Sequence, residues 1–298
     1  MEMKQAPLTR QIVSEFDQMS PQLQQAARYV LDRPHDVALL TMRQQARIAG
    51  VQPATMTRLA KHLGLEGYDG VRELYGQAFR DGGLDFARRA DEQVTRQKLR
   101  GDQALAAEIA SSFAAQVAGL AEPETLSHLV AAAETLARAR RIYCLGMRSC
   151  FPAIAYFHYV TSLVRDGVVL FDGLGGVGAD GLRNAASDDV LLVHTVRPYT
   201  RAVVEAVDYA QTRNVPVVAI TDSAVSPIAD RAQHVILVSV DSPSFFHAMT
   251  PAFTAVEILA ALVAGRGGAN ALKALEETEA QLAAFHIHYD PKHRERPA

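Results

Sequence analysis

The chain has 298 residues, of which 49% are hydrophobic and 21% charged, which argues against a disordered or fibrous protein. Its two cysteines, Cys144 and Cys150, are too few for a disulfide framework. The formal net charge of −3 excludes a generally basic surface, so the charge has to be read region by region.

The two parts of the chain on either side of residue 100 differ in charge. Residues 1–100 hold 15 Lys and Arg against 12 Asp and Glu, whereas the remainder holds 15 against 21. Only the first part therefore favours contact with a polyanion.

The sequence predicts a soluble, cytoplasmic protein without a membrane partner. Residues 1–5 lack the apolar run of a signal peptide. The most apolar late stretch, Ala252 to Ala264, contains Glu257 and is too short to span a bilayer.

The N-terminal region, residues 1–80, has the pattern of a small all-helical domain. Apolar residues recur at three- and four-residue spacings over 8–33, and Pro34 ends that segment. Two short helices are expected between Thr41 and Leu63, and one more over residues 68–80. Residues 81–104 contain Gly82-Gly83 and few large apolar side chains, which predicts a linker.

A DNA-binding helix-turn-helix is indicated by a twenty-residue window that starts at Met42. The fifth position must be small because the helices cross there, and it is Ala46. The ninth position needs a positive φ, and it is Gly50. The packing positions ten, fifteen and eighteen are also apolar, whereas Gln45 departs from the usual apolar fourth position. The alternative is an ordinary helical hairpin, or a module that docks a protein.

Charge favours the DNA-binding interpretation. No Asp or Glu lies between Val37 and Leu65, and a segment without negative charge is attracted to the phosphate backbone of DNA. We expect Gln52, Thr55 and Arg58 on the outer side of the second helix, facing base edges, although Arg58 and Lys61 could alternatively contact phosphates only. The expected DNA-binding residues are Arg43, Gln52, Thr55, Thr57, Arg58 and Lys61.

The later part of the chain alternates strands with helices. Two Ala-rich helices are expected over 104–120 and 123–138, and the apolar runs that follow are Ile142–Leu145, Val168–Phe171, Val190–Val193, Val215–Ile220 and Val235–Val240. Such runs separated by helices predict an α/β domain over residues 105–285, a flavodoxin-like three-layer sandwich with a five-stranded parallel sheet. Residues 286–298 form a polar tail.

Ligands of parallel sheets bind beyond the carboxyl ends of the strands, where four loops are expected. The loops after residues 145 and 194 each lead into a helix N-terminus, which favours an anion, and they carry Arg148 and Arg197. Each Arg could equally form a surface ion pair. The Gly-rich run 173–178 is interpreted as a flexible turn, because it has no Lys-Ser/Thr of a P-loop.

No catalytic, metal or cofactor site is predicted. Cys144 lies inside a strand, and Cys150 lies near a helix start, where a thiol pKa can fall, but no catalytic partner is evident. His194 could line the pocket or be a satisfied core histidine. The histidines of the tail are interpreted as solvated rather than as metal ligands: His286, His288 and His293.

The sequence resembles the RpiR-type transcriptional regulators. The residues that carry the likeness are Thr41–Arg43, Ala49–Val51, Ala54–Leu59, Leu63–Gly64 and Gly67–Tyr68. The later half resembles their sugar isomerase (SIS) domain, most specifically at Val217–Ala229. In the family's Gly-x-Gly-x-Ser loop, Arg148 stands at the second Gly and Cys150 at the Ser. In its Ser-x-Ser-Gly-x-Thr loop, Arg197 stands at the second Ser and Pro198 at the Gly.

The resemblance implies a regulator that binds a double-stranded DNA operator as a homodimer or homotetramer. Its SIS domain would sense a small anionic metabolite, with phosphosugars among the candidates, because an Arg fork binds phosphate or carboxylate. The expected effector-binding residues are Gly146, Arg148, Ser149, Cys150, Thr195, Arg197, Tyr199 and Thr200. The alternative is a phosphosugar isomerase with an accessory helical domain, which needs a positioned base.

Overall fold

The structure is a computed structural model that describes residues 8, 11–12, 15–33, 36–37, 40–80, 86–173 and 180–289. The chain divides into two compact units, Met1–Arg88 and Arg89–Ala298. Each unit has its own hydrophobic core, and each is described by itself.

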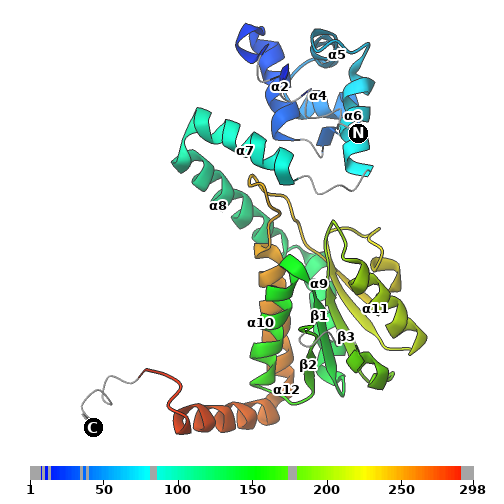
Figure 1. The fold of residues 1–298 in the computed structure, drawn as a ribbon, viewed down its shortest axis with the longest axis vertical. Helices are drawn as coiled ribbons and strands as arrows, with labels where there is room; N and C mark the ends of the chain where they lie inside the picture. Colours follow the sequence, from blue (N-terminus) through cyan, green and yellow to red (C-terminus); the bar gives the residue numbers. More distant parts are fainter. Residues whose placement is uncertain are drawn as a thin grey trace. The chain divides into compact units, whose positions relative to one another are not determined.

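The first unit is helical (Figure 1). Its elements are η1 (Phe16–Gln18), α2 (Pro21–Asp32), α4 (Met42–Ile48), α5 (Pro53–His62) and α6 (Tyr68–Arg80). Apolar side chains at helical spacing meet in one core, with fully buried members on α2 (Ala27 and Val30), α5 (Met56 and Leu59) and α6 (Val71). The predicted set of short helices is therefore confirmed.

Local sequence signals determine where α4 and α5 begin and turn. Thr41 and Gln44 form a capping box at the start of α4, in which each side chain satisfies a backbone N–H. Gly50 has φ +66°, the left-handed conformation that the tight turn requires. Pro53 stands in the first turn of α5, where its missing N–H costs nothing.

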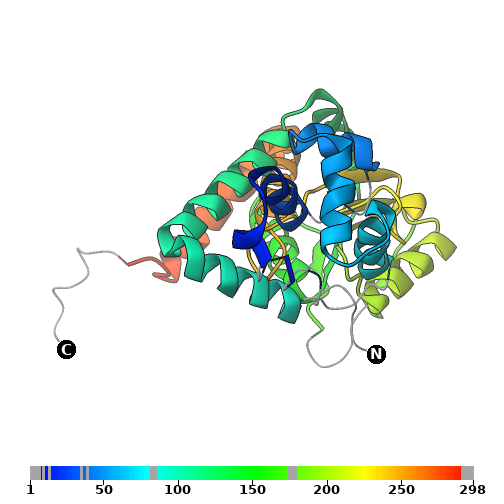
Figure 2. The ribbon, with the colours of Figure 1, turned by 90° about the horizontal axis from the view of Figure 1, so that it is seen from above.

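The segment predicted as a linker is mostly helical. Helix α7 (Phe86–Arg100) covers most of it, and Gly101, with φ +83°, separates α7 from α8 (Asp102–Gly119). The two helices diverge from this corner in both ribbon views (Figures 1 and 2). The linker prediction relied on low apolar content, but α7 is rich in Arg, Gln and Ala, which form helices without burial, and none of its residues is buried.

The second unit contains a parallel five-stranded sheet in the order β2-β1-β3-β4-β5. Its strands are β1 (Ile142–Gly146), β2 (Val168–Leu170), β3 (Val190–His194), β4 (Val217–Thr221) and β5 (His234–Leu237). This is the flavodoxin-like order. The predicted fold class is confirmed.

Helices cover the sheet on both faces. Helices α9 (Pro123–Arg138), α10 (Phe151–Ser162) and α12 (Thr250–Ala284) pack on one face, and α11 (Arg201–Thr212) packs with η4 (Asp180–Asn184) on the other. Alternate residues of each strand point to opposite faces of the sheet. Leu192 packs on the α10 side, and Leu191 packs on the α11 side.

Helix α12 is longer than the apolar stretch predicted in its place. It runs for 35 residues and bends at Gly268. By length and composition alone, α12, or the bent pair of α8 and α9, would also pass as a membrane-spanning segment, although 28% of the apolar window of α12 is buried. Its first half packs in the core of the second unit through Ala255, Val256 and Leu259, as expected of a helix that belongs to a hydrophobic core.

Candidate functional site

Helix α5, the second helix of the predicted helix-turn-helix, has an exposed cationic side. Gln52, Arg58 and Lys61 are exposed, and so is Arg43 on α4. Thr57 is half-buried, and its hydroxyl lies 3.6 Å from the sulfur of Met42. Five of the six predicted DNA-binding side chains are therefore at least partly accessible.

The predicted outward position of Thr55 is wrong. Thr55 is completely buried, and its Oγ1 accepts a hydrogen bond from Nη2 of Arg58 at 3.1 Å. Residues four positions apart lie on the same side of a helix, so Thr55 faces the core when Leu59 packs there. Thr55 therefore holds Arg58 in place instead of reaching a base.

Gln45, the residue that departs from the helix-turn-helix pattern, is buried with all its polar groups paired. Its Nε2 donates to the carbonyls of Val37 (3.1 Å) and Leu40 (2.8 Å), and its Oε1 accepts from the hydroxyl of Tyr68 (2.7 Å). A buried amide is tolerated when its hydrogen bonds are complete. The hydrogen bond between Gln45 and Tyr68 thus links α4 to α6.

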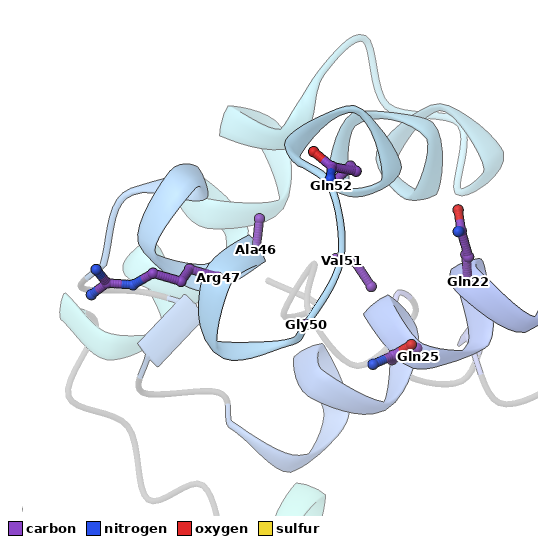
Figure 3. Close-up of a pocket in the computed structure, with 7 residues that line it drawn as sticks. All are labelled: Gln22, Gln25, Ala46, Arg47, Gly50, Val51 and Gln52. Atoms are coloured by element: carbon purple, nitrogen blue, oxygen red, sulfur yellow. The ribbon is translucent and has the colours of Figure 1, made fainter.

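A polar groove of about 270 Å³ lies beside the turn between α4 and α5. Figure 3 shows Gln22 and Gln25 of α2 on one side of it and Gln52, at the start of α5, on another. Nε2 of Gln25 donates to the carbonyl of Ala49 at 2.9 Å, which ties the turn to α2. The groove adds exposed amides next to the cationic side of α5.

The second candidate site lies at the carboxyl ends of β1, β3 and β4. Gly146 pairs with His194, and His194 pairs with Ile220, so the loops that follow these residues start side by side. This is the edge at which parallel sheets bind ligands. The register thus brings together the loops predicted to bind the effector.

The loop after β1 is tightly closed. A Cβ at Gly146 would lie 2.9 Å from both the carbonyl oxygen of Cys150 and Cγ1 of Ile154, so only glycine fits. Arg148 is exposed and has φ +56°, an uncommon conformation for a residue with a side chain. Ser149 Oγ lies 2.9 Å from Nε2 of His247.

The thiol of Cys150 does not have the lowered pKa that its place near a helix start suggested. Burial raises the pKa of Cys150 to about 11, and this effect exceeds the opposing hydrogen bonds from Val196 and Ser149. Cys144 is completely buried, and burial raises its pKa as well. Both thiols are therefore buried and protonated at neutral pH.

The loop after β3 contains the other predicted effector residues. Thr195 is buried, and its Oγ1 accepts from the backbone N–H of Thr200 at 3.4 Å. Arg197 and Tyr199 are half-buried. Burial, and then Asp222, raises the pKa of Tyr199 to about 12, while Arg197 acts in the opposite direction. Arg197, Tyr199 and Asp222 therefore lie within electrostatic reach of one another.

Two further residues at this edge were not predicted as site residues, His247 and Asp222, and His194 was left undecided. Burial lowers the pKa of His194 to about 4, and it also lowers the pKa of His247. Asp222 acts on both histidines. His247 precedes α12 and lies far from the loops in sequence, so only the tertiary structure brings it here.

The segment of residues 241–247, which we name the strap, connects this edge to α7. Its far end carries His247, which pairs with Ser149. Along the strap, four backbone groups bond to side chains of α7 and α8: the carbonyls of Asp241, Ser242 and Pro243 to Gln116, Arg89 and Arg96, and the N–H of Phe245 to Gln93. The residues on α7 recur at helical spacing, so one side of α7 holds the strap.

Some predictions fall outside the described residues. Most of the Gly-rich run 173–178 and the end of the polar tail, including His293, belong to this group. Within the described ranges, no group of three or more His, Cys, Asp or Glu side chains has a metal-binding arrangement.

Comparison with known proteins supports this architecture. Residues 135–262 match the family model of the SIS domain. An RpiR transcription factor from Sphaerobacter thermophilus (sugar isomerase domain) is 24% identical, with a TM-score of 0.54 over 59% of this chain and 98% of that one. The Vibrio vulnificus NanR protein complexed with ManNAc-6P is 19% identical, with a TM-score of 0.52 over 93% and 98%. No curated protein matches the chain in sequence.

These similarities define the class of the protein at the level of fold. The second unit is a SIS domain, and the whole chain has the architecture of a helical head followed by a SIS domain. The predicted arrangement of a helical unit followed by an α/β unit with a SIS domain is thus confirmed. Identities below 25% show the shared fold, and the function rests on the sites themselves.

Proposed function

We propose that the protein is a cytoplasmic, RpiR-type transcriptional regulator that binds operator DNA and senses a small anionic metabolite in its SIS domain. One observation carries the proposal: a helix-turn-helix without acidic residues from Val37 to Leu65 exposes Arg58 and Lys61 on its second helix. Such a helix places cations against phosphates and side chains against base edges in the major groove.

We name the carboxyl ends of β1, β3 and β4, with the loops that follow them, the SIS edge. The effector is anionic because two loops at this edge, after β1 and β3, combine guanidinium groups with helix N-termini. Arg148 precedes α10 and Arg197 precedes α11, and each helix offers free N–H groups to an anion. The NanR structure with ManNAc-6P supports sugar phosphates as one class to test. The proposed effector-binding residues remain Gly146, Arg148, Ser149, Cys150, Thr195, Arg197, Tyr199 and Thr200.

Coupling between the two functions runs through the strap and α7. Displacement of His247 by a ligand at the SIS edge would move the strap, whose carbonyls are held by Arg89 and Arg96 of α7. The ligand must bind two states with different affinity for this to change DNA binding. A homodimer or homotetramer would present two recognition helices to two half-sites.

We propose that the protein is not an enzyme. Isomerisation of a sugar phosphate needs a positioned base beside the sugar, and the four loops contain no Glu. Arg148 and Arg197 also stand where the family's two phosphate-binding loops have a Gly and a Ser. Incubation of the pure protein with ketose and aldose phosphates, followed by chromatography of the products, tests the alternative. Turnover would support the isomerase.

Replacement of Arg58 tests the DNA-binding assignment. Arg58→Ala should weaken binding to a fragment of the protein's own upstream region by about 10-fold or more and reduce operator selectivity, because one base-edge contact contributes about 1–3 kcal/mol. Arg138→Ala, on α9 of the SIS unit, removes one exposed cation as a matched control. Fluorescence anisotropy at several salt concentrations measures both variants.

The salt dependence separates DNA binding from protein docking. Wild-type affinity should fall steeply with salt as counterions are released. An unchanged footprint in Arg58→Ala would contradict the assignment of α5, and equal losses in both variants would show a non-specific charge effect.

A further inference from the structure

His194 stands at the centre of the SIS edge. It ends β3, the middle strand, between Gly146 of β1 and Ile220 of β4. Its side chain is completely buried. A polar ring in this place faces the layer of α10 and α12, where the neighbouring β3 residue on the same side, Leu192, is apolar. The burial of an imidazole here therefore needs an explanation.

The hydrogen bond of one ring nitrogen determines the role of the other. Nδ1 lies 3.0 Å from the carbonyl oxygen of Ile220, and a carbonyl only accepts, so Nδ1 carries the proton and donates. Burial keeps the ring neutral by lowering its pKa to about 4. Nε2 is consequently a hydrogen-bond acceptor.

This acceptor is without a partner among the described residues. Nε2 of His194 is enclosed and makes no hydrogen bond there. An unsatisfied buried acceptor lowers the stability of the protein, and a ligand that supplies a donor recovers this free energy. His194 is therefore different from a satisfied core histidine, because only half of its hydrogen-bonding capacity is used.

The surroundings of His194 define the chemistry that it meets. His247 and Asp222 both lie close enough to influence its protonation. His247 in turn pairs with Ser149, in the loop that also carries Arg148. The edge thus offers acceptors, the Asp222 carboxylate and His194 Nε2, next to the cationic groups for an anion.

We propose that His194 is a specificity-determining residue of the effector site: the anionic group of the effector binds at the Arg148 and Arg197 loops, and one of its hydroxyls donates to Nε2 of His194. This inference rests on the proposed sensing function and assigns the residue that recognises a hydroxyl group of the ligand. Because Nε2 is enclosed, the hydroxyl reaches it only when neighbouring groups move. His247 of the strap is the neighbour that links such a movement to α7.

Matched pairs of anions test the proposal on the full-length protein. Ribose 5-phosphate is compared with methyl phosphate, and gluconate with acetate, by isothermal titration calorimetry. In the wild type, the hydroxylated member of at least one pair should bind 10-fold or more tightly than the hydroxyl-free member. His194→Asn retains a donor to the Ile220 carbonyl but lacks the acceptor, so the ratio of the two affinities should fall from 10 or more to about 1.

A second variant distinguishes loss of the hydrogen-bond acceptor from a general loss of folding. His194→Gln extends an amide oxygen toward the position of Nε2 and should restore part of the preference. A preference that persists in His194→Asn, or a wild type that binds anions without any preference for hydroxyls, would overturn the inference and leave the anion sensor intact. Absence of binding for all four anions would overturn the proposed function as well.

Discussion

At the scale of single residues, burial decides what the polar groups of this protein do. Gln45 and His194 are both completely buried, yet Gln45 has all its polar groups paired while His194 leaves Nε2 without a partner among the described residues. The first arrangement supports the fold, and the second is suited to a ligand. Cys150 shows the same rule for a thiol, whose pKa burial raises to about 11.

The protonation of His194 makes stability depend on pH. An unfolded histidine titrates near pH 6.5, whereas burial lowers the pKa of His194 to about 4 in the folded protein. Between these values the unfolded state binds a proton that the folded state excludes, so stability is complete above about pH 6.5 and falls as the pH falls. At pH 4.5 the loss attributable to His194 should reach about 2–3 kcal/mol.

Urea denaturation of wild type and His194→Asn at pH 7.5 and pH 4.5 measures this contribution. Asparagine does not titrate, so the variant should lose less stability on acidification than the wild type. The comparison cancels the titrating groups that lie far from His194. Identical losses in both proteins would contradict the neutral, buried state of His194.

At the scale of secondary-structure elements, two features shape the functional parts: the turn between α4 and α5, and the strap. The turn depends on Gly50, and the strap is held by α7. The low apolar content of residues 86–100 led to the prediction of a linker there instead of a helix. In both cases a backbone group is held by a glutamine of a neighbouring helix, Gln25 or Gln93. Amide side chains are suited to this because one group both donates and accepts.

The Gly50 turn can be tested against a matched glycine. Gly50→Ala and Gly64→Ala both force alanine into a positive φ, of +66° and +77° respectively, at a similar backbone cost of about 1 kcal/mol. Only the Cβ at position 50 meets another group, Nε2 of Gln25 at 3.1 Å, which bonds to Ala49. Gly50→Ala should therefore cost about 1 kcal/mol more.

Hydrogen exchange of the α4 and α5 amides in the full-length protein measures the two variants. Protection should fall more in Gly50→Ala than in Gly64→Ala, and operator affinity should follow the same order. Equal losses would show that the contact with Gln25 has no energetic importance.

At the scale of the whole molecule, the proposed regulator needs its SIS edge and its helical head to be coupled. The strap connects Ser149 to α7 through hydrogen bonds at both of its ends. Helix α7 crosses the boundary between the two units, since it begins at Phe86 and the first unit ends at Arg88. Such a connection is useful only if ligand binding changes the relative population of two states. The strength of the strap contacts should therefore control regulation separately from binding.

Removal of one strap contact should uncouple the two activities. Arg96→Ala loses the bond to the Pro243 carbonyl (2.8 Å), so whichever of the four anions binds most tightly by calorimetry should alter operator affinity less than in the wild type. Effector affinity should change less than threefold, because Arg96 lies outside the proposed binding loops. Lys98→Ala, an exposed cation on the same helix, is the control. Unaltered regulation in Arg96→Ala would exclude the strap as the connection.

The local patterns of the sequence determined the secondary structure, the helix-turn-helix and the SIS fold, because apolar periodicity, Gly50 and Pro53 act through neighbours a few residues away. They placed Thr55 on the wrong side of α5 and missed α7 as a helix. Only the tertiary structure brought His247 and Asp222 to His194, since strand register and the path of the strap join residues far apart in sequence. Burial and hydrogen-bond pairing are properties of that packing, and they decide which polar groups remain available to a ligand.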